Sequence, residues 1–156
     1  MRSAKPSVLL INRVYPPTKG ASGRVLRDLA REMARAGWTV NILTTGTKTF
    51  TEKDGSITVK RVAAPAKPRG FFAYLVVLFK FYSALLREPR PDLVVTLTDP
   101  PFLVVLGRRF AKRRRCAHVH WCQDLYPDLF VPIGVKLPGF VLKWLGRVSR
   151  RSMNQS

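Results

Sequence analysis

The sequence predicts an α/β fold in which helices cover both faces of a doubly wound, mainly parallel sheet. Short apolar runs such as Val8–Ile11 and Leu93–Leu97 lack polar alternation, as expected of parallel strands that are covered on both faces. Amphipathic segments separate these runs, and the first strand, helix and second strand fall within roughly forty residues, the spacing of a right-handed crossover unit. The chain of 156 residues is long enough for one such domain.

The apolar runs predict five strands and the periodic segments predict four helices. The strands are expected near residues 8–12, 40–44, 57–61, 93–97 and 117–122. The helices are expected after Ser22 as far as a glycine stop at Gly37, and over residues 71–86, 102–115 and 137–152. Residues 45–56 are polar and turn-rich, and the imperfect alternation of residues 57–62 suggests an edge strand.

The loop after the first strand is a candidate site for an anion. Pro16 and Pro17 stop the strand, and glycines at 20 and 23 permit tight backbone. Ser22 is a candidate N-cap, so backbone N–H groups and a helix N-terminus would favour a phosphate here. The segment is neither G-x-G-x-x-G nor G-x-x-x-x-G-K-[ST], and a surface turn closed by its glycines is an equal alternative.

The apolar segment Phe71–Leu86 is interrupted by one charge, Lys80. At about 1.5 Å per residue it is shorter than the ~30 Å hydrocarbon core, which argues against a transmembrane helix. Its nearly uniform hydrophobicity favours a helix buried on the sheet. A helix at a membrane interface is the alternative, because Lys and Arg residues flank the segment on both sides.

The charge of the chain points to an anionic partner. Lys and Arg number 28 against 9 Asp and Glu, a formal net charge of +19. Nucleic acid, acidic lipid and phosphorylated substrates all fit this excess, and charge alone does not choose among them.

The two cysteines, Cys116 and Cys122, provide no disulfide framework, and no secretory signal opens the chain. A reducing, cytoplasmic location is therefore expected.

Polar residues follow three predicted strands and should meet at the carboxyl edge of the sheet, where open α/β sheets bind ligands. The three segments are 16–23, 98–101 and 118–128. His118, His120 and Cys122 share one face of a strand and could bind zinc, but further ligands at useful spacing are missing, which favours core histidines. Asp124 is the better candidate for binding a hydroxyl or assisting proton transfer, with a turn or cap role as the alternative.

Several motifs, in this order and spacing, resemble those of family 4 glycosyltransferases. They are Pro16-Pro17-Thr18-Lys19-Gly20-Ala21, Gly37-Trp38-Thr39-Val40, Pro91-Asp92-Leu93-Val94-Val95, Thr98-Asp99-Pro100-Pro101 and Gln123-Asp124-Leu125-Tyr126-Pro127. The resemblance implies a GT-B architecture of two Rossmann-like domains, of which residues 1–156 form the N-terminal, acceptor-facing one. Trp38 replaces the usual His and Ala21 replaces a second Gly. The C-terminal donor-binding domain, with its E-x7-E pair, is absent from the sequence, so the chain is expected to be inactive without such a half.

The resemblance also implies roles for individual residues. Asp124 would be catalytic, Gly20 and Ala21 would lie nearest the transferred sugar and its phosphates, and Thr98, Asp99 and His118 would complete the substrate site. No cofactor and no metal are expected, because a nucleotide-sugar is the co-substrate. The acceptor would be a lipid-linked or polysaccharide precursor.

The expected partners follow from this substrate class. They are the nucleotide-sugar, the acceptor, an anionic membrane at its inner face and, where it exists, a separate C-terminal glycosyltransferase half. A basic nucleic-acid-binding module is the competing hypothesis. Aromatic residues gather in the apolar helices and not among the basic runs, which argues against a stacking platform. The third hypothesis is a truncated gene product without an independent role.

Overall fold

The computed structural model describes residues 5–65, 68, 70–123 and 147. Two sequence predictions lie outside these residues: the position of Asp124, and the helix over residues 137–152 apart from Arg147.

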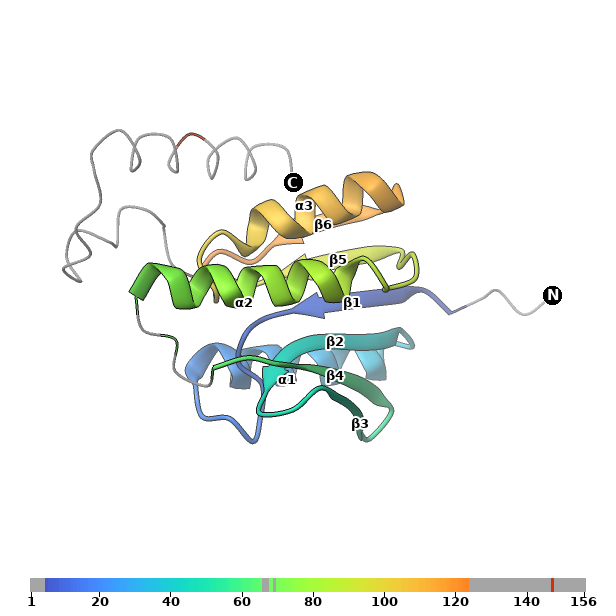
Figure 1. Cartoon of the computed structure of the whole chain (residues 1–156). Coiled ribbons are helices and arrows are strands. Elements are labelled where there is room, and N and C mark those ends of the chain that lie inside the picture. Colours follow the sequence, from blue (N-terminus) through green and yellow to red (C-terminus); the bar gives the residue numbers. More distant parts are fainter. Residues whose placement is uncertain (1–4, 66–67, 69, 124–146, 148–156) are drawn as a thin grey trace.

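A six-stranded sheet forms the centre of the domain, with the order β3-β4-β2-β1-β5-β6 (Figure 1). The strands are β1 (Ser7–Ile11), β2 (Thr39–Gly46), β3 (Phe50–Asp54), β4 (Ile57–Ala63), β5 (Leu93–Thr96) and β6 (Ala117–His120). All neighbours are parallel except β3 and β4, which are antiparallel. The predicted Rossmann-like α/β class is confirmed.

Helices cover both faces of this sheet. They are α1 (Ala21–Arg35) on one face, and α2 (Gly70–Leu85) and α3 (Leu103–Arg114) on the other, in front of the sheet in Figure 1. Strand β1 divides its side chains between the two cores, because Val8 and Leu10 pack with α1 while Leu9 and Ile11 pack with α2 and α3. Burying each such side chain contributes about 1.5–3 kcal/mol, which explains the absence of polar alternation in this strand.

Strand β3 was not predicted. Its presence means that β4, which was expected at the edge of the sheet, is not an edge strand. The segment expected to be turns pairs with β4 from Phe50↔Arg61 to Asp54↔Ile57. Gly55, with φ of 63°, closes the hairpin. The edge of the sheet is therefore β3, whose exposed or half-exposed polar side chains suit an edge, and β4 is an interior strand.

Two predicted helix caps are wrong, whereas the predicted stop of the first helix is right. Gly20, not Ser22, is the N-cap of α1, and Phe102, with φ of 66°, precedes α3 in place of Thr98 or Asp99. Each of these three polar side chains takes a tertiary hydrogen bond instead. Helix α1 ends at Arg35, and Gly37 follows with φ of 90°.

Helix α2 buries one side against the sheet, as predicted, and exposes apolar side chains on the other side. Val77, Phe81 and Leu85 are buried against the sheet, while Phe72 is 81% exposed and Phe79 is 65% exposed. Among the residues that the structure describes, no helix is both long and apolar enough to cross a membrane.

Candidate functional site

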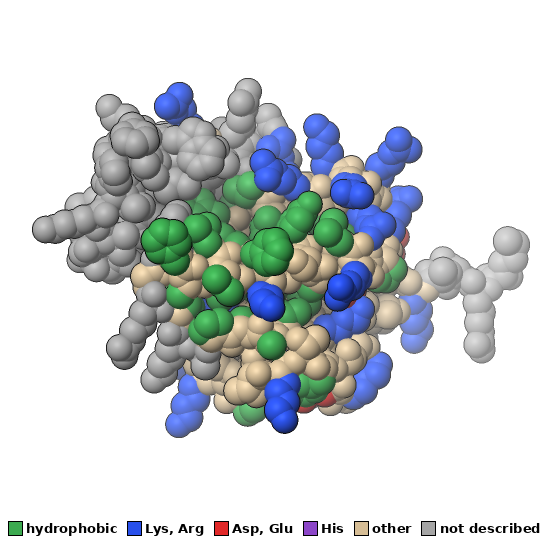
Figure 2. Space-filling view, viewed as in Figure 1, with side chains coloured by type: hydrophobic (Ala, Val, Ile, Leu, Met, Phe, Trp, Pro, Cys, Tyr) green, Lys and Arg blue, Asp and Glu red, His purple; other side chains and the backbone are tan. Residues whose placement is uncertain are grey.

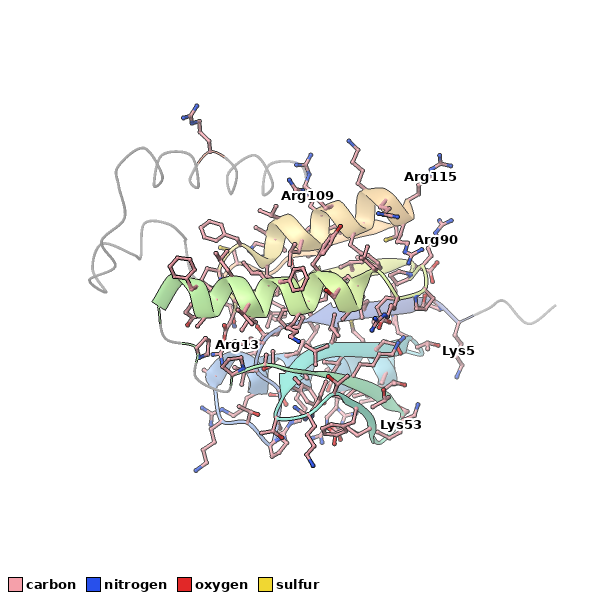
Figure 3. All side chains as sticks on the ribbon, viewed as in Figure 1. Lys5, Arg13, Lys53, Arg90, Arg109 and Arg115 are labelled. Atoms are coloured by element: carbon pink, nitrogen blue, oxygen red, sulfur yellow. The ribbon has the colours of Figure 1, made fainter. Side chains whose placement is uncertain are left out.

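The loop after β1 is joined to the carboxyl end of β2. The carbonyl oxygen of Arg13 accepts hydrogen bonds from Thr44 Oγ1 at 2.9 Å and from Thr45 Oγ1 at 2.8 Å. Figure 3 shows Arg13 at the opposite end of the sheet from Lys5, which precedes β1. The backbone that leaves β1 is thus fixed before it reaches the loop that contains Gly20.

Arg13 also joins the end of β1 to the loop after β5. Its Nε atom lies 2.7 Å from Asp99 Oδ1, and its backbone N–H donates to the Asp99 carbonyl oxygen at 2.7 Å. The two side chains are 15% and 24% exposed. The carboxylate of Asp99, predicted to contact substrate, is therefore engaged by a guanidinium at the rim of the site. Sequence reasoning missed Arg13, whose only signal is its place just after a buried strand.

Thr98 connects the loops after β5 and β6. Its hydroxyl, on a residue that is 5% exposed, accepts a hydrogen bond from the Gln123 backbone N–H at 2.9 Å. Gln123 is the residue before Asp124, the predicted catalytic residue, and is the last one described in this segment. Gln123 therefore lies at the same edge as Thr98.

The first turn of α1 packs tightly on the end of β1. A Cβ atom at Gly20 would lie 2.9 Å from Val14 Cγ1, and one at Gly23 would lie 3.1 Å from the Val14 carbonyl oxygen. Asn12 is buried and donates through Nδ2 to that carbonyl at 2.9 Å and to Ser22 Oγ at 3.2 Å. Both glycines thus permit a close approach that a side chain would prevent.

This approach forms a basic pocket of about 400 Å³ at the start of α1. Its lining residues are Pro16, Pro17, Thr18, Lys19, Gly20, Arg24 and Arg27. The volume lies in the usual range for small-molecule sites, roughly 300–1,000 Å³. Two exposed cations, Lys19 and Arg24, and the positive end of the helix favour an anionic ligand. The predicted Gly20 lines the pocket, and Ala21 is the exposed residue that follows it.

The buried side chain of Arg61 holds the loop that contains Pro16 in place. The sequence did not indicate this role of Arg61. It is 4% exposed, and its guanidinium donates to the carbonyl oxygen of Pro16 at 2.5 Å and to Glu52 Oε1 at 2.6 Å. The rings of Tyr15 and Phe50 lie 5.9 Å and 6.0 Å from Arg61 Cζ. Nothing in the sequence around Arg61 indicates that its side chain binds the loop at Pro16, which is distant in the chain.

The Tyr15 hydroxyl fixes the β3–β4 hairpin to the same loop. It donates to Asp54 Oδ2 at 2.7 Å, and this hydrogen bond lowers the pKa of the Asp54 carboxyl. Burial and the neighbouring Asp54 raise the pKa of Tyr15. Both groups therefore keep their ordinary charge at neutral pH, and the hydrogen bond is preserved.

His118 and His120 share one face of β6, as predicted, and both contact Thr96. Thr96 Oγ1 lies 2.9 Å from His118 Nε2 and 3.0 Å from His120 Nδ1. Burial, with His120 and Arg108 nearby, lowers the pKa of His118 to about 4, and burial lowers the pKa of His120. His118 lies under α3 at Gly107, where a Cβ atom would be 2.8 Å from its Nε2 atom. Within the described part of the chain, no group of three or more His, Cys, Asp or Glu residues is placed to hold a metal ion.

Most of the chain matches a known protein family. The family model described as a glycosyl transferase 4-like domain matches residues 20–156. The chain belongs to this family. The search of curated proteins gives no match. The matched range of this glycosyltransferase 4-like domain begins at Gly20 and includes every predicted site residue.

Proposed function

We propose that this glycosyltransferase 4-like domain is the acceptor-side half of a retaining enzyme that transfers a sugar from a nucleotide-sugar to a lipid-linked or polysaccharide precursor. The observation that carries the proposal is the basic pocket at Gly20. It follows β1 at the same carboxyl edge of the sheet as the contacts of Arg13, Thr98 and Gln123, although none of these three residues lines it. A phosphate-bearing donor and a hydroxylated acceptor can meet at such an edge. The family match supports the reaction class.

The residues of the edge have distinct proposed roles. The backbone at Gly20 and Ala21 lies beside the transferred sugar and its phosphates, and Lys19 and Arg24 attract their charge. Asp124 accepts a hydrogen bond from the attacking acceptor hydroxyl or assists its proton transfer. Thr98 anchors the segment that leads to Asp124, and Asp99 holds the Arg13 guanidinium at the rim. His118, which packs beneath α3 at Gly107, stays neutral at physiological pH and supports the acceptor side from within the fold.

The donor requires a second domain in this proposal. In the GT-B architecture that the family implies, a facing Rossmann-like domain grips the nucleotide-sugar, and the reaction takes place between the two. The described domain presents its carboxyl edge and the basic pocket toward that partner. We expect the chain to bind a nucleotide-sugar weakly without such a half.

We further propose that the domain works at the inner face of an anionic membrane. Six apolar residues are exposed along one side of α2 and at the position that follows it, and we name them the outer stripe: Phe72, Leu75, Val76, Phe79, Tyr82 and Leu86. Figure 2 shows hydrophobic side chains gathered on this face with Lys and Arg side chains around them. An apolar stripe bordered by cations suits an interface of acyl chains and anionic head groups.

A transfer assay tests the proposed function. The chain, combined with a donor-binding half, is incubated with a membrane extract and a panel of radiolabelled nucleotide-sugars that differ in base and sugar. We expect label from one donor to appear in the lipid or polysaccharide fraction, and only when both halves are present. Absence of transfer from every donor, together with tight duplex-DNA binding at physiological salt, would favour the nucleic-acid hypothesis instead.

A further inference from the structure

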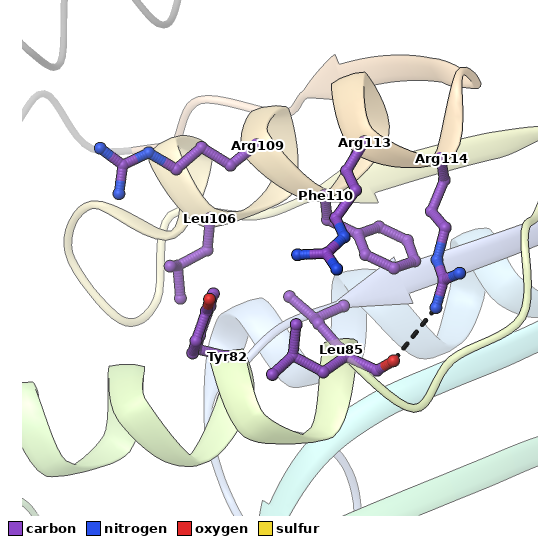
Figure 4. A pocket seen from close by; sticks show the side chains of 8 residues that line it. Tyr82, Leu85, Leu106, Arg109, Phe110, Arg113 and Arg114 are labelled. Atoms are coloured by element: carbon purple, nitrogen blue, oxygen red, sulfur yellow. Dashed lines mark hydrogen bonds between the residues drawn. The ribbon is translucent and has the colours of Figure 1, made fainter.

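A second pocket lies far from the strand edge, in the groove between α2 and α3 (Figure 4). Its volume is about 270 Å³, and its lining residues are Tyr82, Leu85, Leu86, Leu106, Arg109, Phe110, Arg113 and Arg114. No acidic side chain is among them. The groove therefore combines an apolar floor with a cationic rim.

The three arginines of the groove are not equivalent. Arg114 has a structural role, because its Nη2 atom donates to the carbonyl oxygens of Leu86 at 3.1 Å and Glu88 at 2.6 Å, beyond the end of α2. Arg109 and Arg113 are both exposed, one helical turn apart on α3. Over the described residues, neither of these two guanidiniums has a hydrogen-bonding or ionic partner. Figure 4 shows Arg113 directed into the groove toward Leu85, whereas Arg109 extends away from it. Arg113 is thus placed for an anion in the groove, and the exposed side chain of Arg109 can join it by rotation.

The carboxylate of Glu88, whose carbonyl oxygen Arg114 binds, does not compensate this charge. Glu88 is 6% exposed, and its Oε2 atom lies 2.7 Å from Lys60 Nζ, in an ion pair directed toward β4. Arg114 lies over the Phe110 ring, with 5.6 Å between its Cζ atom and the ring centroid. The rim therefore carries an excess of positive charge beside an apolar wall, which is the complement of an anionic amphiphile.

The groove is continuous with the outer stripe of α2, because Tyr82 and Leu86 belong to both. We propose that it is a binding site for the phosphate head group of an anionic membrane lipid. Arg109 and Arg113 hold the phosphate oxygens, while Tyr82, Leu86 and Leu106 cover the first carbons of the acyl chains. This inference rests on the proposed membrane location and specifies the lipid contact that fixes the domain there.

The apolar wall distinguishes a lipid phosphate from a free one. Inorganic phosphate would gain only the two guanidiniums, whereas a phospholipid also removes apolar surface of Tyr82, Leu86 and Leu106 from water. A zwitterionic lipid would bring its own cation next to Arg109 and Arg113. Anionic lipid should therefore bind more tightly than either inorganic phosphate or phosphatidylcholine.

Titration of the ¹⁵N-labelled full chain with dihexanoylphosphatidylglycerol, kept below its micelle concentration, tests the site without a bilayer. We expect saturable amide shifts at Leu106, Arg109 and Phe110. The double variant Arg109→Gln/Arg113→Gln should bind at least tenfold more weakly. The control Lys112→Gln/Arg115→Gln removes the same charge from the same end of α3, outside the groove, and should bind like the wild type. All four positions are exposed, so the variants are expected to fold.

The titration would overturn the proposal if the wild-type chain showed no saturable shift at the groove or if both double variants lost binding equally. Equal binding of inorganic phosphate or of dihexanoylphosphatidylcholine would overturn it as well. Co-sedimentation with phosphatidylglycerol vesicles separates this result from the proposed membrane location. If wild-type chain and Arg109→Gln/Arg113→Gln sediment equally, the membrane location stands and the groove is not the lipid site. Loss of sugar transfer is not needed for either conclusion.

Discussion

The Arg13 Nε atom lies 2.7 Å from Asp99 Oδ1, and this ion pair joins the strand ends of β1 and β5 across the candidate site. The same two residues share a backbone hydrogen bond of 2.7 Å, so the contact is fixed both in the main chain and in the side chains. The Arg13 carbonyl also binds the hydroxyls of Thr44 and Thr45. The residue Arg13, in the loop after β1, thus connects the carboxyl end of β2 with the loop after β5.

Asp99→Asn should destabilise the domain through this contact. The partly buried pair is expected to be worth about 1–2 kcal/mol, more than an exposed pair and less than a fully buried one. Urea unfolding measures the change. Glu32→Gln is the matched control, because its pair with Arg35 lies on exposed side chains and should contribute less than about 0.5 kcal/mol. Equal effects of the two variants would mean that the Arg13–Asp99 pair does not stabilise the edge.

Gly107→Ala tests the packing of α3 on the sheet. A Cβ atom there would lie 2.3 Å from Thr96 Cγ2 and 2.8 Å from His118 Nε2. Overpacking of this kind costs about 1–3 kcal/mol and should exceed the gain of about 1 kcal/mol in helix propensity. Thermal unfolding should therefore show a lower Tm for Gly107→Ala, while Lys112→Ala on the exposed side of α3 stays within a degree or two of the wild type. An unchanged or higher Tm in Gly107→Ala would show that α3 can move away at no cost.

The histidines of β6 predict a pH dependence of stability. The pKa of His118 falls from 6.5 to about 4 on folding, because burial disfavours the charged ring. The unfolded chain then binds more protons than the folded chain between these values, so stability is fully present above pH 6.5 and is lost as the pH falls toward 4.

Urea unfolding between pH 7.5 and pH 4.5 measures this slope. In His118→Gln the slope should be smaller than in the wild type, whatever the absolute stability of the variant, because one titrating group is removed. The comparison of slopes also cancels the carboxyl groups that titrate at the acid end in both proteins. Identical slopes would mean that His118 is protonated as easily in the folded chain as in the unfolded one.

The outer stripe of α2 predicts a salt-resistant part of membrane binding. Phe72→Ser/Phe79→Ser removes its two most exposed aromatic rings. Co-sedimentation with acidic vesicles should then disappear as salt shortens the Debye length, whereas the wild type keeps a remainder from inserted apolar side chains. The control Val119→Ser/Trp121→Ser removes exposed apolar groups at β6 and should leave that remainder unchanged. Equal salt curves for the wild type and Phe72→Ser/Phe79→Ser would exclude insertion by α2.

The elements of this fold that are predictable from the sequence are those with apolar side chains on a regular period. The unbroken run of β1 and the one-sided pattern of α1 follow directly from burial in two cores. Strand β3 was missed because its sequence, Phe50–Asp54, is polar and its stability comes from pairing with β4. The Asp54-Gly55 dipeptide is a known hairpin signal and could have indicated it.

The candidate site is only partly predictable, for a different physical reason. Sequence order places Gly20 and Thr98 at strand ends, and parallel strands bring these ends to one edge. The contacts that fix the edge are long-range: Arg13 with Asp99, and Arg61 with the Pro16 carbonyl oxygen. Local propensity contains no information on such pairs. The same holds for Ser22 and Thr98, whose expected capping bonds lost to tertiary partners.

The proposed role of Asp124, which is to act on the acceptor in a sugar transfer at this edge, is tested by comparing turnover with stability in Asp124→Ala. The variant chain, combined with a donor-binding half, is assayed for transfer from the nucleotide-sugar that the wild type uses, and its unfolding free energy is determined in urea. We expect a loss of kcat of at least about 100-fold, as for removal of a group that assists proton transfer, with a change in stability below about 1 kcal/mol. Undiminished transfer by Asp124→Ala, or a loss of activity that only follows unfolding, would contradict it.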